Sequence, residues 1–210
     1  MVHPAIDDSP LILVQAHIIG LHGRSQAGKD TIADYLVRQH HYMKLSFAEP
    51  VKAAAHLLLD VPRALESMYK DTYLPNYPFT LRDAYIAMTE GLEARLCPEL
   101  FLIINSNRIA NLIRNGQHKI VIQDVRYEWS AFLIHELGGE VWNIRRGEPP
   151  CGLFEAGWQW LMERRLPLSE RTFPGRKIDR VLYNNRSIEK LLSRCVDPSL
   201  DAYESTHTLI

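Results

Sequence analysis

A glycine-rich loop between an apolar run and an amphipathic segment constrains this chain most. The loop follows Ile18-Ile19-Gly20-Leu21 and reads Gly23-Arg24-Ser25-Gln26-Ala27-Gly28-Lys29-Asp30-Thr31. Glycines at 23 and 28 let the backbone curl so that successive N–H groups point inward, which is the geometry that holds phosphate oxygens. A helix starting at Lys29 adds the partial positive charge of its N-terminus. The pattern predicts a phosphate-binding loop between a strand and a helix.

The loop residues expected to bind ATP are Gly23, Arg24, Ala27, Gly28, Lys29, Asp30 and Thr31. Lys29 supplies a point charge for the β- and γ-phosphates. Asp30 occupies the position where this type of loop usually has Ser or Thr, and Thr31 is the nearest hydroxyl. A carboxylate beside a triphosphate repels it unless it faces magnesium, a basic residue or the acceptor. The alternative is that Asp30 only complements the helix N-terminus.

A second candidate element is the apolar run Ile120-Val121-Ile122-Gln123, which ends in Asp124 and is followed by Val125-Arg126. The carboxyl ends of neighbouring parallel strands share one crevice, so Asp124 is expected to meet the glycine loop there. Asp124 is a candidate to hold magnesium through water, and Arg126 to neutralise charge on a transferring phosphoryl group. The alternative for Asp124 is a turn or helix cap.

Short apolar runs alternate with longer helical segments along most of the chain. Strands are expected at His17–His22, Tyr42–Phe47, Lys119–Gln123, Glu140–Ile144 and Arg180–Tyr183. Helices are expected at Lys29–Gln39, Pro50–Leu59, Thr80–Arg95, Pro98–Asn115, Glu128–Leu137 and Ser187–Ser193. Strands separated by helices predict an α/β fold with a five-stranded parallel sheet flanked by helices and right-handed crossovers.

The predicted domain organisation is simple. Residues 1–16 form a loosely ordered lead-in, residues 17–196 a single domain, and residues 197–210 a C-terminal tail. Two stretches depart from the alternation of strands and helices. They are a mostly helical insertion at 60–98 and a Gly/Pro-bearing segment at 146–177.

Composition limits the class of protein. The formal net charge of the 210 residues is -1, which gives no bulk reason to bind nucleic acid or a membrane surface. The apolar runs fall short of the roughly 18 to 20 residues that a membrane span requires. Three widely spaced cysteines, Cys97, Cys151 and Cys195, indicate reduced thiols rather than a disulfide framework or a zinc site. These features predict a soluble, cytoplasmic protein.

Several motifs, taken in order, resemble the bacteriophage-type deoxynucleoside monophosphate kinases, within the P-loop nucleoside monophosphate kinase group. The likeness runs from about residue 18 to 196. It rests on Gly28-Lys29-Asp30-Thr31, Phe47-Ala48-Glu49-Pro50-Val51-Lys52, Asp124-Val125-Arg126, Leu137-Gly138-Gly139, Leu168-Ser169-Glu170, Ile178-Asp179 and Asn184-Asn185. The Asp after the loop lysine is ordinary in that group.

The resemblance implies transfer of the ATP γ-phosphate to a deoxynucleoside 5′-monophosphate, with magnesium, in the P-loop kinase three-layer fold. The 60–98 insertion would then bind the acceptor, and 146–177 would be the lid. Lys52 and Arg82 are candidates to hold the acceptor phosphate, and Thr89-Glu90 lies beside the acceptor site. Arg145 joins Lys29, Asp124 and Arg126 as a catalytic candidate. The host cytoplasm is the expected location if the protein is phage-encoded, and the oligomeric state stays open, a homodimer being one alternative.

The sequence departs from the family pattern at three places. Pro167 replaces a histidine, Met88 replaces the glycine before Thr-Glu, and Glu49 replaces an Asp. Two other functions therefore stay open. One is a P-loop kinase for another phosphorylated acceptor, of the phosphomevalonate or dephospho-coenzyme A type, and the other is a nucleotide-binding regulatory module without transfer activity. The preferred base and the choice between deoxyribose and ribose are not decided.

Overall fold

The computed structural model describes residues 16–147, 177–185 and 187–206. Five parallel strands form one sheet in the order β2-β3-β1-β4-β5. They are β1 (His17–His22), β2 (Met43–Leu45), β3 (Lys119–Ile122), β4 (Glu140–Arg146) and β5 (Arg180–Asn184). In register, Ile19 of β1 lies opposite Val121 of β3 and Glu140 of β4. The predicted α/β fold with a five-stranded parallel sheet is confirmed.

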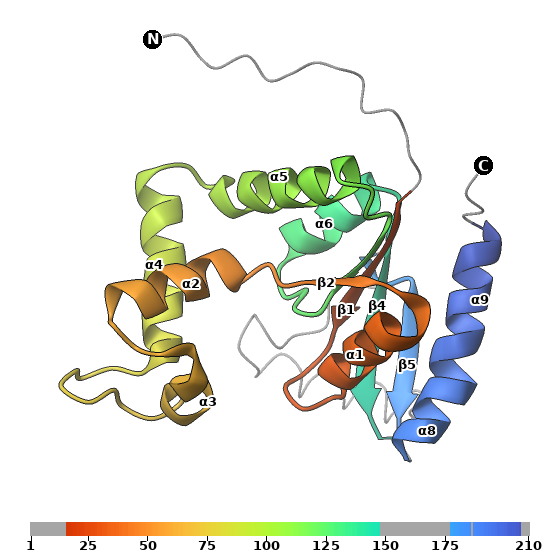
Figure 1. The fold of residues 1–210 in the computed structure, drawn as a ribbon, viewed down its shortest axis with the longest axis horizontal. Coiled ribbons are helices and arrows are strands. Elements are labelled where there is room, and N and C mark those ends of the chain that lie inside the picture. The colour runs from red at the N-terminus through yellow and green to blue at the C-terminus, as the bar shows by residue number, and fades with distance from the viewer. Residues whose placement is uncertain (1–15, 148–176, 186, 207–210) are drawn as a thin grey trace, which may run out of the picture.

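Helices cover both faces of the sheet (Figure 1). On one face lie α1 (Lys29–His40) and the C-terminal helices α8 (Ile188–Leu191) and α9 (Asp197–Thr206), and on the other α5 (Leu100–Arg114) and α6 (Glu128–Glu136). Beyond the sheet edge are α2 (Glu49–Leu58), the short η1 (Arg63–Leu65) and α3 (Glu66–Tyr69), and α4 (Leu81–Arg95). These last elements form a separate lobe, which we call the α2–α4 lobe (residues 49–95).

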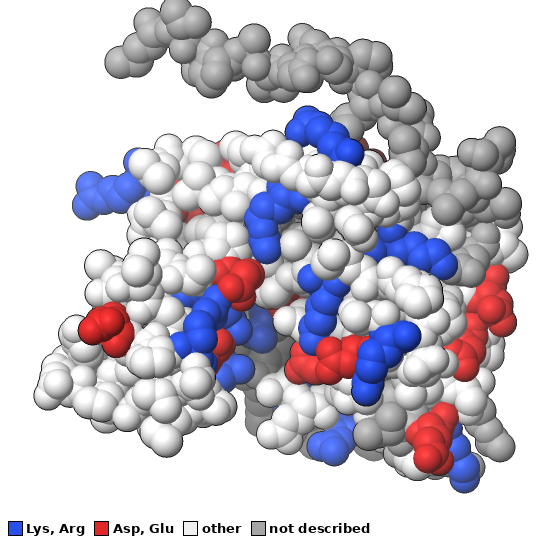
Figure 2. Space-filling view, in the orientation of Figure 1, with Lys and Arg blue, Asp and Glu red and all other residues white. Residues whose placement is uncertain are grey.

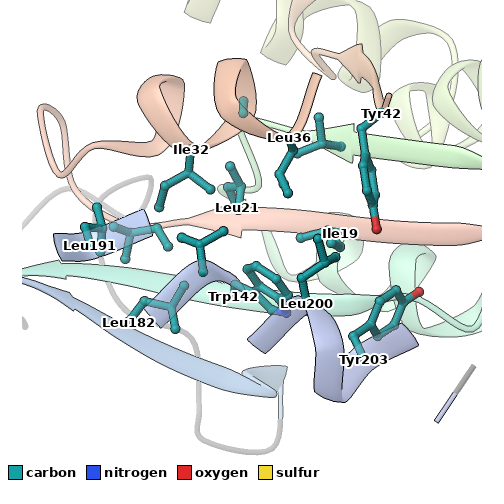
Figure 3. Packing of buried hydrophobic residues seen from close by; sticks show 14 of the residues in the cluster. Ile19, Leu21, Ile32, Leu36, Tyr42, Trp142, Leu182, Leu191, Leu200 and Tyr203 are labelled. Carbon is teal, nitrogen blue, oxygen red and sulfur yellow. The ribbon is translucent and has the colours of Figure 1, made fainter. Parts of the chain in front are cut away.

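Side-chain alternation along the central strands divides the core in two. Ile19 and Leu21 of β1 pack with α1 and α9, whereas Ile18 of the same strand packs with α5 and α6. Figure 3 shows the first of these clusters, in which Trp142 of β4 lies between the sheet and Leu200. Both faces of each central strand are buried, which is why the strands read as continuous apolar runs.

The C-terminal boundary predicted at residue 196 is wrong. A π-helical turn at Leu192–Val196 joins α8 to α9, which ends at Thr206. Pro198 has no N–H for the usual helical bond, and the turn before it is wider, with the Asp197 N–H donating to the Leu192 carbonyl. Tyr203 is fully buried, and its hydroxyl accepts a 3.0 Å hydrogen bond from the Ile18 N–H. Residues 197–206 are thus part of the domain core rather than a tail.

The helix and strand bounds otherwise lie within a few residues of the predictions. The second strand is shorter than expected, because Tyr42 and Phe47 lie in the turns that flank β2. The lead-in at 1–15 and most of the lid, 148–176, lie outside the described residues. Within the described ranges, the helices lack the combination of length and hydropathy that crossing a membrane would demand.

Candidate phosphotransfer site

The glycine loop leaves the centre of the sheet, where β1 ends, and turns into α1. Three of its residues have positive φ: Gly23 at 137°, Gln26 at 60° and Gly28 at 108°. A Cβ on Gly23 would lie 2.3 Å from the backbone oxygen of Ile144, so only glycine fits where the loop passes the end of β4. The loop shape is therefore imposed by its contact with the neighbouring strand as well as by its own sequence.

A residue that the sequence analysis did not single out for a role braces the other end of the loop. The side-chain amide of Asn184, at the end of β5, donates a 2.9 Å hydrogen bond to the Ala27 carbonyl. A Cβ on Gly28 would lie 2.8 Å from that same amide nitrogen. Asn184 in turn accepts a bond from the Gly147 N–H at 3.2 Å. Asn184-Asn185 was noted only as a motif, and the side-chain bond to Ala27 is what places Asn184 beside the loop.

Lys29 begins α1 and is half-buried. Its ammonium donates to the carbonyls of Gly23 at 2.6 Å and Arg24 at 2.7 Å. The lysine thus spans its own loop and holds its charge against two carbonyls at the start of the loop. Arg24 and Asp30 are exposed, Thr31 is half-buried and Ala27 is buried.

Asp124 follows β3 and accepts three hydrogen bonds from the turn before α2. Its carboxylate receives the Ser46 hydroxyl at 2.7 Å, the Phe47 N–H at 2.8 Å and the Ala48 N–H at 3.0 Å. The opposite side of this turn is also held, because Arg108 of α5 donates to the Ser46 carbonyl at 2.7 Å. Asp124 therefore anchors a turn that is distant in sequence and precedes the helix that carries Lys52, which differs from the local turn or helix cap that was the alternative.

Arg126 follows a residue that is tied to the end of β1. The Val125 N–H donates to the Leu21 carbonyl at 3.2 Å, and His22 Nδ1 donates to the Val125 carbonyl at 2.8 Å. Arg126 is half-buried, and its charge acts on Lys70 of the lobe. The backbone beside Arg126 is thus fixed to the strand that leads into the glycine loop, while its charge reaches the lobe.

The predicted acceptor residues Lys52 and Arg82 come from different helices of the lobe and are both ion-paired. Lys52 binds Glu66 at 2.7 Å, and Arg82 binds Asp71 at 2.6 Å. Lys52 also lies over the ring of Tyr85, 5.8 Å from its centroid. Both candidate cations therefore already have a carboxylate partner within the lobe.

Lys70 is a further cation of this cluster, and the sequence analysis missed it. Burial lowers its pKa, and the charges of Lys52, Arg82 and Arg126 lower it further, with a smaller opposing effect of Asp71. A single lysine in a mixed, Pro-rich insertion carries no sequence signal of such a setting. Figure 2 shows Lys and Arg side chains gathered beside the hollow between the α2–α4 lobe and the sheet.

The remaining predicted residues are less closely joined. Thr89 is half-buried on the face of α4 that also carries Arg82 and Tyr85, and its hydroxyl donates to the Tyr85 carbonyl at 2.8 Å. Glu90 is exposed, and its charge acts on Glu93, whose pKa is raised by burial and then by Glu90. Arg145, near the end of β4, is half-buried, whereas Arg146 is exposed, as strand alternation predicts.

The metal candidates do not form a ready-made cage. In the described part of the chain, no group of three or more His, Cys, Asp or Glu side chains could hold an ion. Asp124 already accepts three hydrogen bonds, which fits an outer, water-bridged role better than direct coordination. Magnesium commonly keeps several waters and takes only one or two carboxylates from the protein.

A comparison with known proteins is consistent with this site. The chain is 28% identical over 206 residues to a protein of Acanthamoeba polyphaga mimivirus named "Putative deoxynucleotide monophosphate kinase", covering 86% of this chain and 96% of that protein. Kinase function is supported by this similarity. No family model matches the sequence.

Solved structures align over most of the chain at low scores. Dephospho-CoA kinase from Campylobacter jejuni has a TM-score of 0.45 and 13% identity, with 90% of this chain and 98% of that chain covered. TT1252 from Thermus thermophilus has a TM-score of 0.47 and 19% identity, with the same coverage of 90% and 98%. Scores of this size carry no argument about the site.

Proposed function

We propose that this protein is an ATP-dependent kinase that transfers the γ-phosphoryl group to the phosphate of a deoxynucleoside 5′-monophosphate. The proposal is supported by one observation about Arg126. Its neighbour Val125 is bonded to the end of β1, which leads into the braced glycine loop with Lys29, and its charge acts on Lys70 in the cation cluster of the α2–α4 lobe.

The chemistry needs little from the protein beyond positioning and charge. An oxygen of the acceptor phosphate forms a bond to the γ-phosphorus while the bond from that phosphorus to the β,γ-bridging oxygen breaks, which yields ADP and a deoxynucleoside diphosphate. Lys29 and the loop N–H groups hold the ATP phosphates. Arg126 stabilises the charge that spreads over the transferring group.

The acceptor side is oriented from the sheet. Asp124 fixes residues 46–48, and this turn sets the direction in which α2 presents Lys52. Magnesium bound near Asp30 and, through water, near Asp124 would neutralise triphosphate charge. We propose further that the enzyme is similar to the phage-type kinases, that it requires magnesium, and that residues 146–177 act as its lid.

A panel of acceptors with ATP and magnesium tests the proposal. The four common deoxynucleoside monophosphates, their ribose counterparts, phosphomevalonate and dephospho-coenzyme A are each supplied, and ADP release is measured. We expect release to depend on at least one deoxynucleoside monophosphate and to be lost in Lys29→Ala. Turnover of phosphomevalonate or dephospho-coenzyme A alone would assign a different acceptor. ATP binding without transfer to any acceptor would favour a regulatory module.

A further inference from the structure

The cation cluster has a charge balance that suits one class of ligand. Ion pairs join Lys52 and Arg63 to Glu66, Arg63 to Glu49, and Arg82 to Asp71. Lys70 and Arg126 complete the cluster through their mutual charge interaction. Within the described residues, the cluster therefore contains five cations and three carboxylates, an excess of two positive charges.

The position of Lys70 follows from the backbone. Lys70 is four residues after Glu66 and keeps helical dihedrals, so the two side chains lie on the same face, one turn apart. Glu66 holds Lys52 at 2.7 Å, which brings the α2 cation to this face. The Arg82 N–H donates to the Lys70 carbonyl at 3.2 Å, which ties the segment to the start of α4.

At Lys70 the charges of Lys52, Arg82 and Arg126 outweigh the opposing charge of Asp71. Among the residues that the structure describes, no carboxylate forms an ion pair with Lys70 or Arg126, whereas Lys52 and Arg82 each have one. Half-burying a lysine among three other cations is unfavourable unless an anion compensates for it. Such a cost is typical of a binding site that is completed by its ligand.

We infer that Lys70 is a further substrate-binding residue, which together with Arg126 contacts the doubly ionised phosphate of a phosphate-monoester acceptor. A phosphate monoester carries about -1.5 to -2 charges near pH 7, close to the imbalance of the cluster. The inference deepens the proposed function and rests on it. It selects acceptors that present a terminal phosphate over acceptors that present only a hydroxyl group.

Three variants test the inference. Lys70→Met removes the charge but keeps a long apolar side chain, and Lys70→Arg keeps the charge. Lys44→Met is the matched control, because Lys44 lies on β2 in an exposed ion pair with Asp34. For each protein, the dissociation constants of inorganic phosphate and of each deoxynucleoside monophosphate are measured by calorimetry, together with the KM values for acceptor and ATP.

We expect Lys70→Met to weaken phosphate and monophosphate binding on the order of tenfold to a hundredfold, the usual value of a charged hydrogen bond, with the KM for ATP unchanged. Lys70→Arg should restore most of the affinity, and Lys44→Met should change neither constant. Without ligand, Lys70→Met should unfold at the same or a higher temperature than the wild type, because it removes repulsion between cations.

The outcomes separate this inference from the proposed function. If Lys70→Met alters acceptor binding less than twofold, or if Met and Arg variants lose affinity equally and both melt lower, Lys70 has no binding role. If the wild type transfers phosphate to none of the acceptors, the proposed function fails. The calorimetric comparison with inorganic phosphate still decides the role of Lys70 in that case.

Discussion

The two halves of the site are built by different physical means. The glycine loop is held by the close approach of Gly23 to Ile144 and by hydrogen bonds to its carbonyls from the Asn184 amide and the Lys29 ammonium. The α2–α4 lobe is held by ion pairs between partly exposed groups, such as Lys52 with Glu66 and Arg82 with Asp71. The first half therefore depends mainly on backbone geometry, whereas the second depends on charge.

This difference accords with the ligands that each half is proposed to bind. Triphosphates share one shape, so a loop fixed by packing can serve them with little reorganisation. The acceptor must enter, react and leave as a more highly charged product. Exchangeable ion pairs near the surface contribute little stability each, and their rearrangement costs correspondingly little.

The largest effect is expected where the two halves meet. Lys29→Ala and Arg126→Ala should each lower kcat by on the order of a hundredfold or more, because both groups act on phosphoryl charge. Steady-state kinetics with the preferred acceptor measure this effect. Arg114→Ala, on the exposed end of α5, is the control and should keep wild-type turnover. Near-normal kcat in both site variants would contradict the assignment of the site.

The packing of the glycine loop is tested next by Gly23→Ala. A Cβ 2.3 Å from the Ile144 oxygen, added at a φ of 137°, should lower the free energy of unfolding by about 2 kcal/mol or more and abolish ATP binding. Gly116→Ala is the matched control, because its φ is 81° but its Cβ would meet nothing within 4 Å. Gly116→Ala should lower the free energy of unfolding by only about 1 kcal/mol. Equal losses in denaturant unfolding would show that the loop is not braced by β4.

A smaller effect is expected at the brace on the other side of the loop. Asn184→Ala removes the amide that donates to the Ala27 carbonyl, and the loss of one such bond should raise the KM for ATP severalfold, about 1 kcal/mol. The KM for the acceptor should not change. Asn185→Ala, which alters the exposed neighbour, serves as the control. If the KM for the acceptor rose as much as the KM for ATP, the proposed division between the two halves would be wrong.

The smallest effect concerns the pH dependence of the ion-paired half. Burial pushes the pKa of Glu66 up, but the hydrogen bond from Lys52 and the charges of Lys52, Arg63 and His56 outweigh it, so the pKa lies below 4.5. A carboxyl group with a lowered pKa stabilises the fold above its unfolded pKa, and this stability is lost as pH falls through the folded value.

Glu66→Gln should remove that part of the acid sensitivity. Melting temperatures measured from pH 6 downwards should fall less steeply in the variant. The corresponding difference in the free energy of unfolding should be below about 1 kcal/mol, because the pair is partly screened by water. Glu136→Gln, at the end of α6, provides a control for a carboxyl outside the lobe. Parallel curves for wild type and Glu66→Gln would mean that the ion pairs of the lobe add no stability.

Local patterns in the chain sufficed for most of the fold. The apolar runs at His17–His22 and Lys119–Ile122 are strands, and the glycine loop joins a strand to a helix as predicted. The C-terminal helix was missed because Leu200 and Tyr203 are isolated apolar residues in a polar stretch. Their role is visible only once β1 and β4 provide the surface that they cover.

The candidate site also has one part that the local sequence predicts and another that appears only in the folded structure. The sequence by itself located the glycine loop between a strand and a helix, because the glycines and Lys29 that mark it lie within nine consecutive residues and act through local backbone geometry. Only the tertiary structure decided which groups surround it: Asn184 from 157 positions away, Asp124 as the anchor of the turn before α2, and Lys70 among cations from three other segments. Hydrogen bonds and charges act through space, so residues that meet only after folding leave no local pattern to read.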